Sequence, residues 1–255
     1  MGVRRPDSAL PDPALPGDLL AGYHRFRAIR YAGERDRYRQ LGEEGQRPAT
    51  MVVACSDSRS APETVFDAGP GELFVVRNVA ALVPVYAPDA RSHAASAALE
   101  FAVLGLGVGS ILVMSHGRCG GIAAALEDPA PLSATDFIGA WVAGVRDLVA
   151  GLDPAEAGDP ARLRTALEHE SVERSIANLR TFPWIRAREA SGAVGLHGAW
   201  FDVALGELHA LGSGGWTRIT DAGAKSTPRR RTGIVAGSRF DPPKGSATAR
   251  TSGRI

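Results

Sequence analysis

Two cysteines and one histidine closely follow short apolar segments of the sequence. Cys55 comes directly after the apolar run 51–54, and Cys119 lies five residues after the run 110–114, with His116 between them. Ligand and catalytic groups gather at the carboxyl ends of strands in open parallel sheets, so the three side chains could converge there. Two thiolates and an imidazole make a good zinc ligand set, and three protein ligands leave a fourth position open for catalysis.

The same residues also allow simpler interpretations. A single cysteine after a strand is usually a small buried hydrophobic residue. A Cys55–Cys119 disulfide is disfavoured in a reducing compartment. A redox-active thiol pair is disfavoured because the sequence has no Cys-x-x-Cys motif. Spacing alone therefore leaves a metal site and ordinary buried cysteines as open alternatives.

A carboxylate and a guanidinium stand close to Cys55 in the segment Cys-Ser-Asp-Ser-Arg. In an extended backbone, residues i and i+2 share a side, so Asp57 could approach the same metal as Cys55. Arg59 could hold that carboxylate in a two-pronged ion pair. A carboxylate that either binds the metal or pairs with arginine would gate the fourth position. The plain alternative is a surface ion pair that contributes little stability.

The elements that must position these residues alternate between strands and helices. Apolar runs at 51–54, 73–76 and 110–114 predict buried parallel strands. Helices are expected at 18–44, 93–104, 122–127, 133–150 and 159–180, and a pair of strands at 193–211 with its turn near Gly206. This order predicts an α/β fold with a mainly parallel central sheet flanked by helices.

The two ends of the chain differ in composition from its body. Residues 1–15 are rich in proline and predict a flexible arm. Residues 221–255 carry eight cations and two anions with few large apolar side chains, which predicts a disordered basic tail. The segment between them, 16–220, is expected to form a single catalytic domain that begins with a helical arm.

Overall composition excludes several classes of protein. The 255 residues carry 29 Lys and Arg against 28 Asp and Glu, so the net charge of +1 gives no overall reason to expect nucleic acid as a partner. The longest uncharged apolar stretch, 101–114, is too short and too rich in glycine to span a membrane. The N-terminal residues lack the apolar core of a signal peptide, so a cytoplasmic location is expected.

Two motifs together resemble the β-class carbonic anhydrases. They are Cys-Ser-Asp-Ser-Arg at 55–59 and His-Gly-Arg-Cys-Gly-Gly at 116–121. The likeness continues in three further segments, at 70–80, 175–179 and 198–202, and covers about residues 16–218. Val52 and Ala54 differ from the tryptophan and glycine of the bicarbonate-inhibited bacterial branch, which favours the plant-type branch.

The resemblance implies a role for each matching residue. Cys55, His116 and Cys119 would bind Zn²⁺, and Asp57 would either pair with Arg59 or close the site by binding zinc itself. The residues that match substrate-pocket positions are Gln46, Phe74, Val79, Phe101 and Gly120. Phe101 stands where the plant-type pattern has a tyrosine, so any function of that hydroxyl is missing here.

The implied activity is that of a carbonic anhydrase, a zinc lyase. It hydrates carbon dioxide reversibly to bicarbonate and a proton by way of zinc-bound hydroxide. The family forms homodimers or multiples of dimers, with N-terminal helices lying across the partner, a role that the predicted helix from Asp18 fits. Three alternatives stay open. The first is hydrolysis of carbon disulfide or carbonyl sulfide on the same fold, and the second is a non-catalytic zinc protein in which Asp57 permanently closes the site. The third is a role of the basic tail in binding nucleic acid or anionic surfaces, for which a solvated disordered extension is the simpler interpretation.

Overall fold

The computed structural model describes residues 15–89, 92–127, 130–152 and 158–220. The predicted basic tail, 221–255, and nearly all of the predicted arm lie outside these residues. The chain divides into two units, Met1–Ile219 and Thr220–Ile255, and all elements described below belong to the first.

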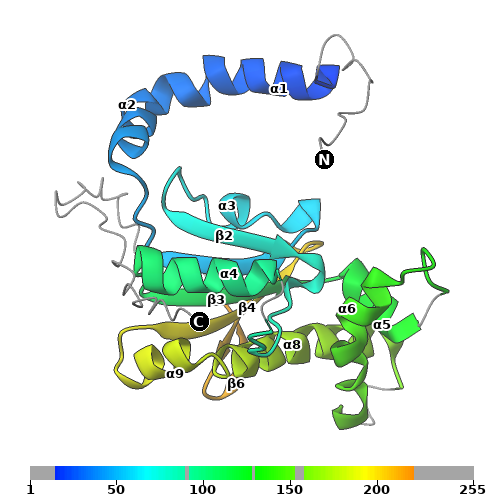
Figure 1. The fold of residues 1–255 in the computed structure, drawn as a ribbon. Helices are drawn as coiled ribbons and strands as arrows, with labels where there is room; N and C mark the ends of the chain where they lie inside the picture. The colour runs from blue at the N-terminus through cyan, green and yellow to red at the C-terminus, as the bar shows by residue number, and fades with distance from the viewer. Residues whose placement is uncertain (1–14, 90–91, 128–129, 153–157, 221–255) are drawn as a thin grey trace, which may run out of the picture. The chain divides into compact units, whose positions relative to one another are not determined.

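A six-stranded sheet has the order β2-β1-β3-β4-β5-β6 (Figure 1). Its strands are β1 (Thr50–Cys55), β2 (Leu73–Asn78), β3 (Ser110–His116), β4 (Gly195–Asp202), β5 (Glu207–Gly212) and β6 (Gly215–Arg218). β1 pairs in parallel with β2 and β3, and β3 pairs in parallel with β4, whereas β5 and β6 are antiparallel. The α/β fold with a mainly parallel sheet is confirmed, and β6 is an additional edge strand.

The central strand β1 is buried on both faces of the sheet. Met51 and Val53 belong to one hydrophobic cluster, and Val52 and Ala54 belong to another on the opposite face. This alternation follows from the two-residue period of a strand. Because both faces are covered, the sequence of β1 is a continuous apolar run rather than an alternating one.

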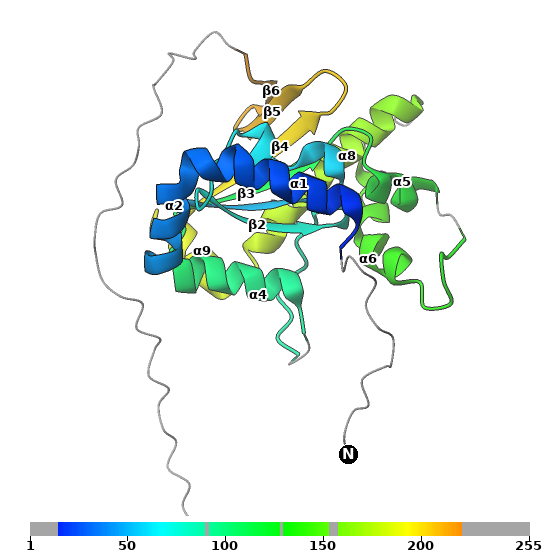
Figure 2. The same ribbon diagram turned by 90° about the horizontal axis from the view of Figure 1, so that it is seen from above.

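Helices cover the sheet and its carboxyl end. Those of the described chain are α1 (Gly17–Ala28), α2 (Arg30–Glu44), α3 (Pro62–Val65), α4 (Ala94–Glu100), α5 (Gly120–Glu127), α6 (Phe137–Arg146), α8 (Pro160–Leu179) and α9 (Pro183–Ala190). Leu99, Ile176 and Ile185 bring α4, α8 and α9 into one core with β1 and β3. α5 and α6 lie together beyond the carboxyl ends of the parallel strands (Figure 1 and Figure 2).

The N-terminal helical segment is broken, although the sequence predicts one helix over 18–44. α1 and α2 meet at Ile29, and the break lets Tyr31 and Tyr38 pack against Phe26 with ring centroids 6.1 and 5.7 Å away. Neither helix contains a buried residue. Arg37 of α2 donates to the backbone oxygen of Pro70, which ties the arm to the loop before β2.

Several predicted helix boundaries shift for identifiable reasons. Asp159 caps α8 as expected, its side chain accepting from the backbone of Ala161 and Arg162. The helix expected over 133–150 starts only at Phe137, because the Asp136 side chain accepts from the backbone of Gly139 and caps it there. α4 changes to a π-helical turn after Glu100, and α9 was not predicted. Among the described helices, none has the length and apolar character that a membrane span requires.

His169 packs inside an aromatic cluster beside β4 and β6. Its ring stacks on Trp216 with centroids 4.2 Å apart and meets the edge of Trp200 at 5.1 Å. Burial, with a smaller contribution from His209, lowers the pKa of His169 to about 4. The neutral ring is thus part of the packing, which gives His169 a structural role.

Candidate metal centre

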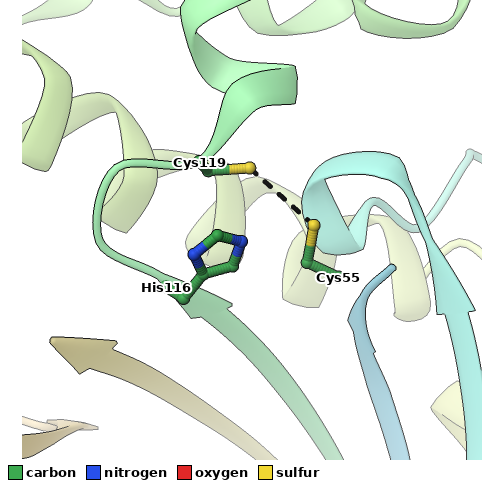
Figure 3. A group of neighbouring side chains, drawn as sticks. All are labelled: Cys55, His116 and Cys119. Atoms are coloured by element: carbon green, nitrogen blue, oxygen red, sulfur yellow. Dashed lines mark hydrogen bonds between the residues drawn. The ribbon is translucent and has the colours of Figure 1, made fainter. Parts of the chain in front are cut away.

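The parallel register brings both cysteines and the histidine to one end of the sheet. Cys55 is the last residue of β1, and His116 is the last residue of the neighbouring strand β3. Cys119 follows three residues after His116, immediately before α5. The three side chains point toward one another across the carboxyl ends of these strands (Figure 3).

The three ligand atoms are close enough to share one ion. The sulfur, nitrogen and sulfur atoms of Cys55, His116 and Cys119 all lie within 4.8 Å of one another, and the two sulfurs are 3.9 Å apart. Two thiolates bound to one zinc at about 2.3 Å in tetrahedral geometry have sulfurs about 3.8 Å apart. Both cysteines are free and buried, so this short distance is not a disulfide.

The hydrogen bonding of His116 leaves one ring nitrogen available to bind a metal. Its Nδ1 lies 3.0 Å from the backbone oxygen of Gly117, which accepts a hydrogen bond from the protonated nitrogen. This bond leaves Nε2 as the nitrogen that faces the sulfurs, and Nε2 is buried without a hydrogen-bond partner. A bare buried nitrogen is costly, and a metal ion in the cluster would satisfy it. The donor set therefore fits zinc.

Protonation of the two thiols is strongly linked. The hydrogen bond from Cys119, together with His116, lowers the pKa of Cys55 despite its burial. The same hydrogen bond and burial raise the pKa of Cys119. Burial alone would lower the pKa of His116, but the nearby sulfur and negative charge of Cys55 outweigh it and raise that pKa. One thiolate is thus already favoured in the absence of an ion.

Asp57 and Arg59 form the ion pair that the sequence predicts. Asp57 Oδ1 accepts from the backbone nitrogen and Nε of Arg59, both at 2.9 Å, and Oδ2 accepts from Nη2 at 2.6 Å. These bonds hold the pKa of the Asp57 carboxyl well below its usual range. Asp57 Oδ2 also lies 3.8 Å from His116 Nε2, so the carboxylate borders the ligand cluster without belonging to it.

Two further residues hold this site, and sequence reasoning did not assign them. Arg77, near the end of β2, donates to the backbone oxygens of Cys55 and Asp57. Glu168, buried in α8, accepts from the backbone nitrogen of Cys119 at 3.0 Å. Burial raises the pKa of Glu168. Arg77 lies in a segment similar to the family, but nothing in the local sequence of α8 marks Glu168.

Val79 and Gly120 lie together beside the ligand cluster. They line a cavity of about 280 Å³ whose other walls are mostly apolar residues of α5, α6 and the segment 130–136 that precedes α6. Close packing requires glycine at the start of α5, because a Cβ on Gly121 would lie 2.6 Å from a methyl carbon of Val79. The structure thus brings two of the five predicted pocket residues to the metal end of the sheet.

Comparison with known proteins decides the family. The family model described as carbonic anhydrase matches residues 50–208. The chain belongs to the carbonic anhydrase family. It is 34% identical over 194 residues to "Carbonic anhydrase" of Pseudomonas aeruginosa, a match that covers 76% of this chain and 86% of that protein. It is 32% identical over 192 residues to "Beta carbonic anhydrase 5, chloroplastic" of Arabidopsis thaliana, covering 72% and 61%.

Solved structures place this carbonic anhydrase in the β class. The β-carbonic anhydrase CcaA matches with a TM-score of 0.70 and 29% identity, over 76% of this chain and 94% of that one. A structure described among two tetrameric β-carbonic anhydrases of Sordaria macrospora matches with a TM-score of 0.67 and 26% identity, over 78% and 96%. The protein is therefore an enzyme of the lyase class, as the sequence motifs predict.

The remaining pocket residues of this β-carbonic anhydrase lie at the opposite end of the sheet. Phe74 pairs with Met51, four residues before Cys55, which puts the two levels about 13 Å apart along the strands. Phe101 packs on Phe74 with ring centroids 5.8 Å apart, and exposed Gln46 precedes β1. A single chain does not bring Gln46, Phe74 and Phe101 to the metal ligands.

Proposed function

We propose that this protein hydrates carbon dioxide reversibly to bicarbonate and a proton, using Zn²⁺ held by Cys55, His116 and Cys119. The observation that carries the proposal is the convergence of three buried donor atoms with Nε2 of His116 left unpartnered. When bound, zinc supplies hydroxide near neutral pH by lowering the pKa of a water molecule, which is the general chemistry of carbonic anhydrases.

Asp57 orients the nucleophile in this proposal. Arg59 keeps the carboxylate ionised, so Oδ2 is a hydrogen-bond acceptor throughout the working pH range. Oδ2 borders the ligand cluster and can accept the hydrogen of a water or hydroxyl group there. Holding that hydrogen directs the oxygen lone pair away from Asp57 and toward the substrate. Both carboxylate oxygens of Asp57 accept from Arg59, and this pairing argues against a permanently closed site.

The neighbouring cavity suits carbon dioxide as the substrate. Carbon dioxide is small and apolar, and the walls next to Val79 are largely apolar side chains. Gly120 begins α5, and the positive end of a helix dipole favours the charge that develops on bicarbonate. The site therefore has an apolar region for the substrate and a polar edge for the product.

A second copy of the chain completes the pocket in this proposal. Gln46, Phe74 and Phe101 are at the wrong end of their own sheet, so they reach a metal site only when a neighbouring protomer presents them. The arm formed by α1 and α2 offers a contact surface for such a neighbour, with Leu19 60% and Ile29 74% exposed. We propose a homodimer or a multiple of dimers. A cytoplasmic location stays a prediction from the sequence.

The proposal is tested by comparing substrates on matched histidine variants. We expect the wild-type protein to hydrate carbon dioxide and to leave carbon disulfide and carbonyl sulfide largely unreacted. His116→Ala should lose both zinc and hydration. His197→Ala, which alters an exposed histidine of β4, should keep both. Faster turnover of a sulfur-containing substrate, or full hydration by His116→Ala, would reject the proposed function.

A further inference from the structure

The peptide unit between Arg118 and Cys119 is held at both of its polar ends. Its carbonyl oxygen accepts a hydrogen bond from Arg59 Nη2 at 3.1 Å, and its N–H donates to Glu168 Oε1 at 3.0 Å. Arg118 has a φ of +59°, a left-handed conformation that is unfavourable for a residue with a Cβ. The turn that presents Cys119 therefore depends on contacts from outside itself.

Glu168 makes this contact from a fully buried position. Its side chain is 1% exposed in the middle of α8. The second carboxylate oxygen accepts from Trp200 Nε1 at 2.9 Å, so each oxygen has its own donor. Hydrogen bonds to a charged acceptor are stronger than neutral ones. A buried carboxylate is costly unless its oxygens are hydrogen-bonded, and an apolar residue in its place would leave both of these donors without an acceptor.

The geometry fixes the direction of the Cys119 side chain. A peptide group is planar, so it can only rotate as a unit about its two flanking bonds. That rotation would change ψ of Arg118 and φ of Cys119, and any shift of the Cys119 backbone that carried Sγ away from Cys55 and His116 would also break its hydrogen bond to Glu168. The rotation would also turn the carbonyl toward Glu168 and the N–H toward Arg59, reversing both favourable contacts. Glu168 and Arg59 together oppose this rotation.

We propose that Glu168 is a positioning residue for metal binding, which holds Cys119 Sγ in place through the backbone N–H of Cys119. The role rests on the zinc site of the proposed function and adds a residue outside the ligand set and the Asp57–Arg59 pair. Removing an outer partner of a metal ligand commonly weakens metal binding about 10- to 100-fold.

The test measures zinc retention by competition with a chelator, and folding by urea denaturation, in matched variants. In Glu168→Gln, only the amide oxygen can still accept a hydrogen bond from the two donors, Cys119 N and Trp200 Nε1. The amide nitrogen is itself a donor, so it opposes whichever N–H it faces. We expect the zinc dissociation constant of this variant to rise about 10- to 100-fold in a folded protein. Ser171→Ala removes a hydrogen bond to the backbone oxygen of Glu168 on the same helix, and should retain zinc as the wild type does.

A double variant separates positioning from packing. In Glu168→Gln with Trp200→Phe, the donor facing the amide nitrogen is gone and the amide oxygen can serve Cys119 alone. Zinc retention should recover toward the wild-type value, although the lost indole lowers stability. Unchanged zinc retention in Glu168→Gln, or a double variant that retains zinc no better than Glu168→Gln, would overturn the inference. A wild-type protein that neither contains zinc when purified nor binds zinc when it is added would instead overturn the proposed function.

Discussion

A mixed dimer of two inactive variants should regain activity if the pocket is shared between chains. Cys55→Ser removes a metal ligand, and Gln46→Ala removes a pocket residue from the opposite end of the sheet. In a dimer containing one chain of each kind, the chain with Gln46→Ala keeps its metal ligands. Its site is completed by the intact Gln46 of the other chain, while the second site receives both defects.

The strand register shows why one chain cannot complete its own site, and the symmetry of the dimer sets the expected activity. Phe74 pairs with Met51, and Cys55 lies four residues further along β1, so about 13 Å separates the two ends of the site within one chain. No side chain of Gln46 or Phe74 spans that distance. In a symmetric dimer with shared sites, the mixed species has one intact site of two and about half of the wild-type carbon dioxide hydration.

The mixed dimer is isolated by co-expressing the two variants with different affinity tags and purifying through both. Hydration is then measured per dimer by stopped-flow. A dimer that combines Cys55→Ser with His116→Ala is the matched control and should stay inactive, because neither chain has a complete ligand set. An inactive mixed dimer of Cys55→Ser and Gln46→Ala that still binds zinc, or a monomeric wild-type protein, would refute the shared pocket.

Three further outcomes follow from the structure. Asp57→Asn should keep its zinc but lose about 100-fold or more in hydration, because the amide cannot be a charged acceptor. Unchanged turnover across the pH range would reject the role of Asp57 as a gate of the fourth metal position. The unfolded chain protonates His169 near its usual pKa of 6.5 and the folded chain only near 4, so the free energy of unfolding should fall by about 2 kcal/mol from pH 7 to pH 5. His169→Phe should lack that part of the fall in urea denaturation, and an equal fall in both proteins would contradict the assignment. Deleting 221–255 should leave hydration and assembly intact, and the loss of either would assign the segment a function.

The metal ligands could be predicted because their positions depend on simple features of the chain. A continuous apolar run before Cys55 and another before His116 indicate buried parallel strands, and parallel strands end at the same edge of a sheet. The Asp57–Arg59 pair is local, its members two positions apart, so its geometry also follows from the sequence.

Other features depend on packing that local sequence does not reveal. Glu168 is 49 residues from Cys119, and only the placement of α8 beside β3 brings them together. The break at Ile29 accompanies aromatic contacts between α1 and α2 that the helical period of the sequence does not indicate. β6 forms by pairing with β5, a tertiary contact that its own short sequence does not reveal. For Gln46, Phe74 and Phe101 the family pattern names the residues, but only the strand register shows that one chain cannot assemble them.

The central claim is that carbon dioxide hydration depends on zinc held by Cys55, His116 and Cys119. The most direct test measures zinc content and hydration rate together, in the wild type and Cys55→Ser, while zinc is removed and restored. We expect about one zinc per wild-type chain, hydration that rises and falls in proportion to bound zinc, and neither zinc nor hydration in Cys55→Ser. Full hydration by zinc-free protein would contradict the account.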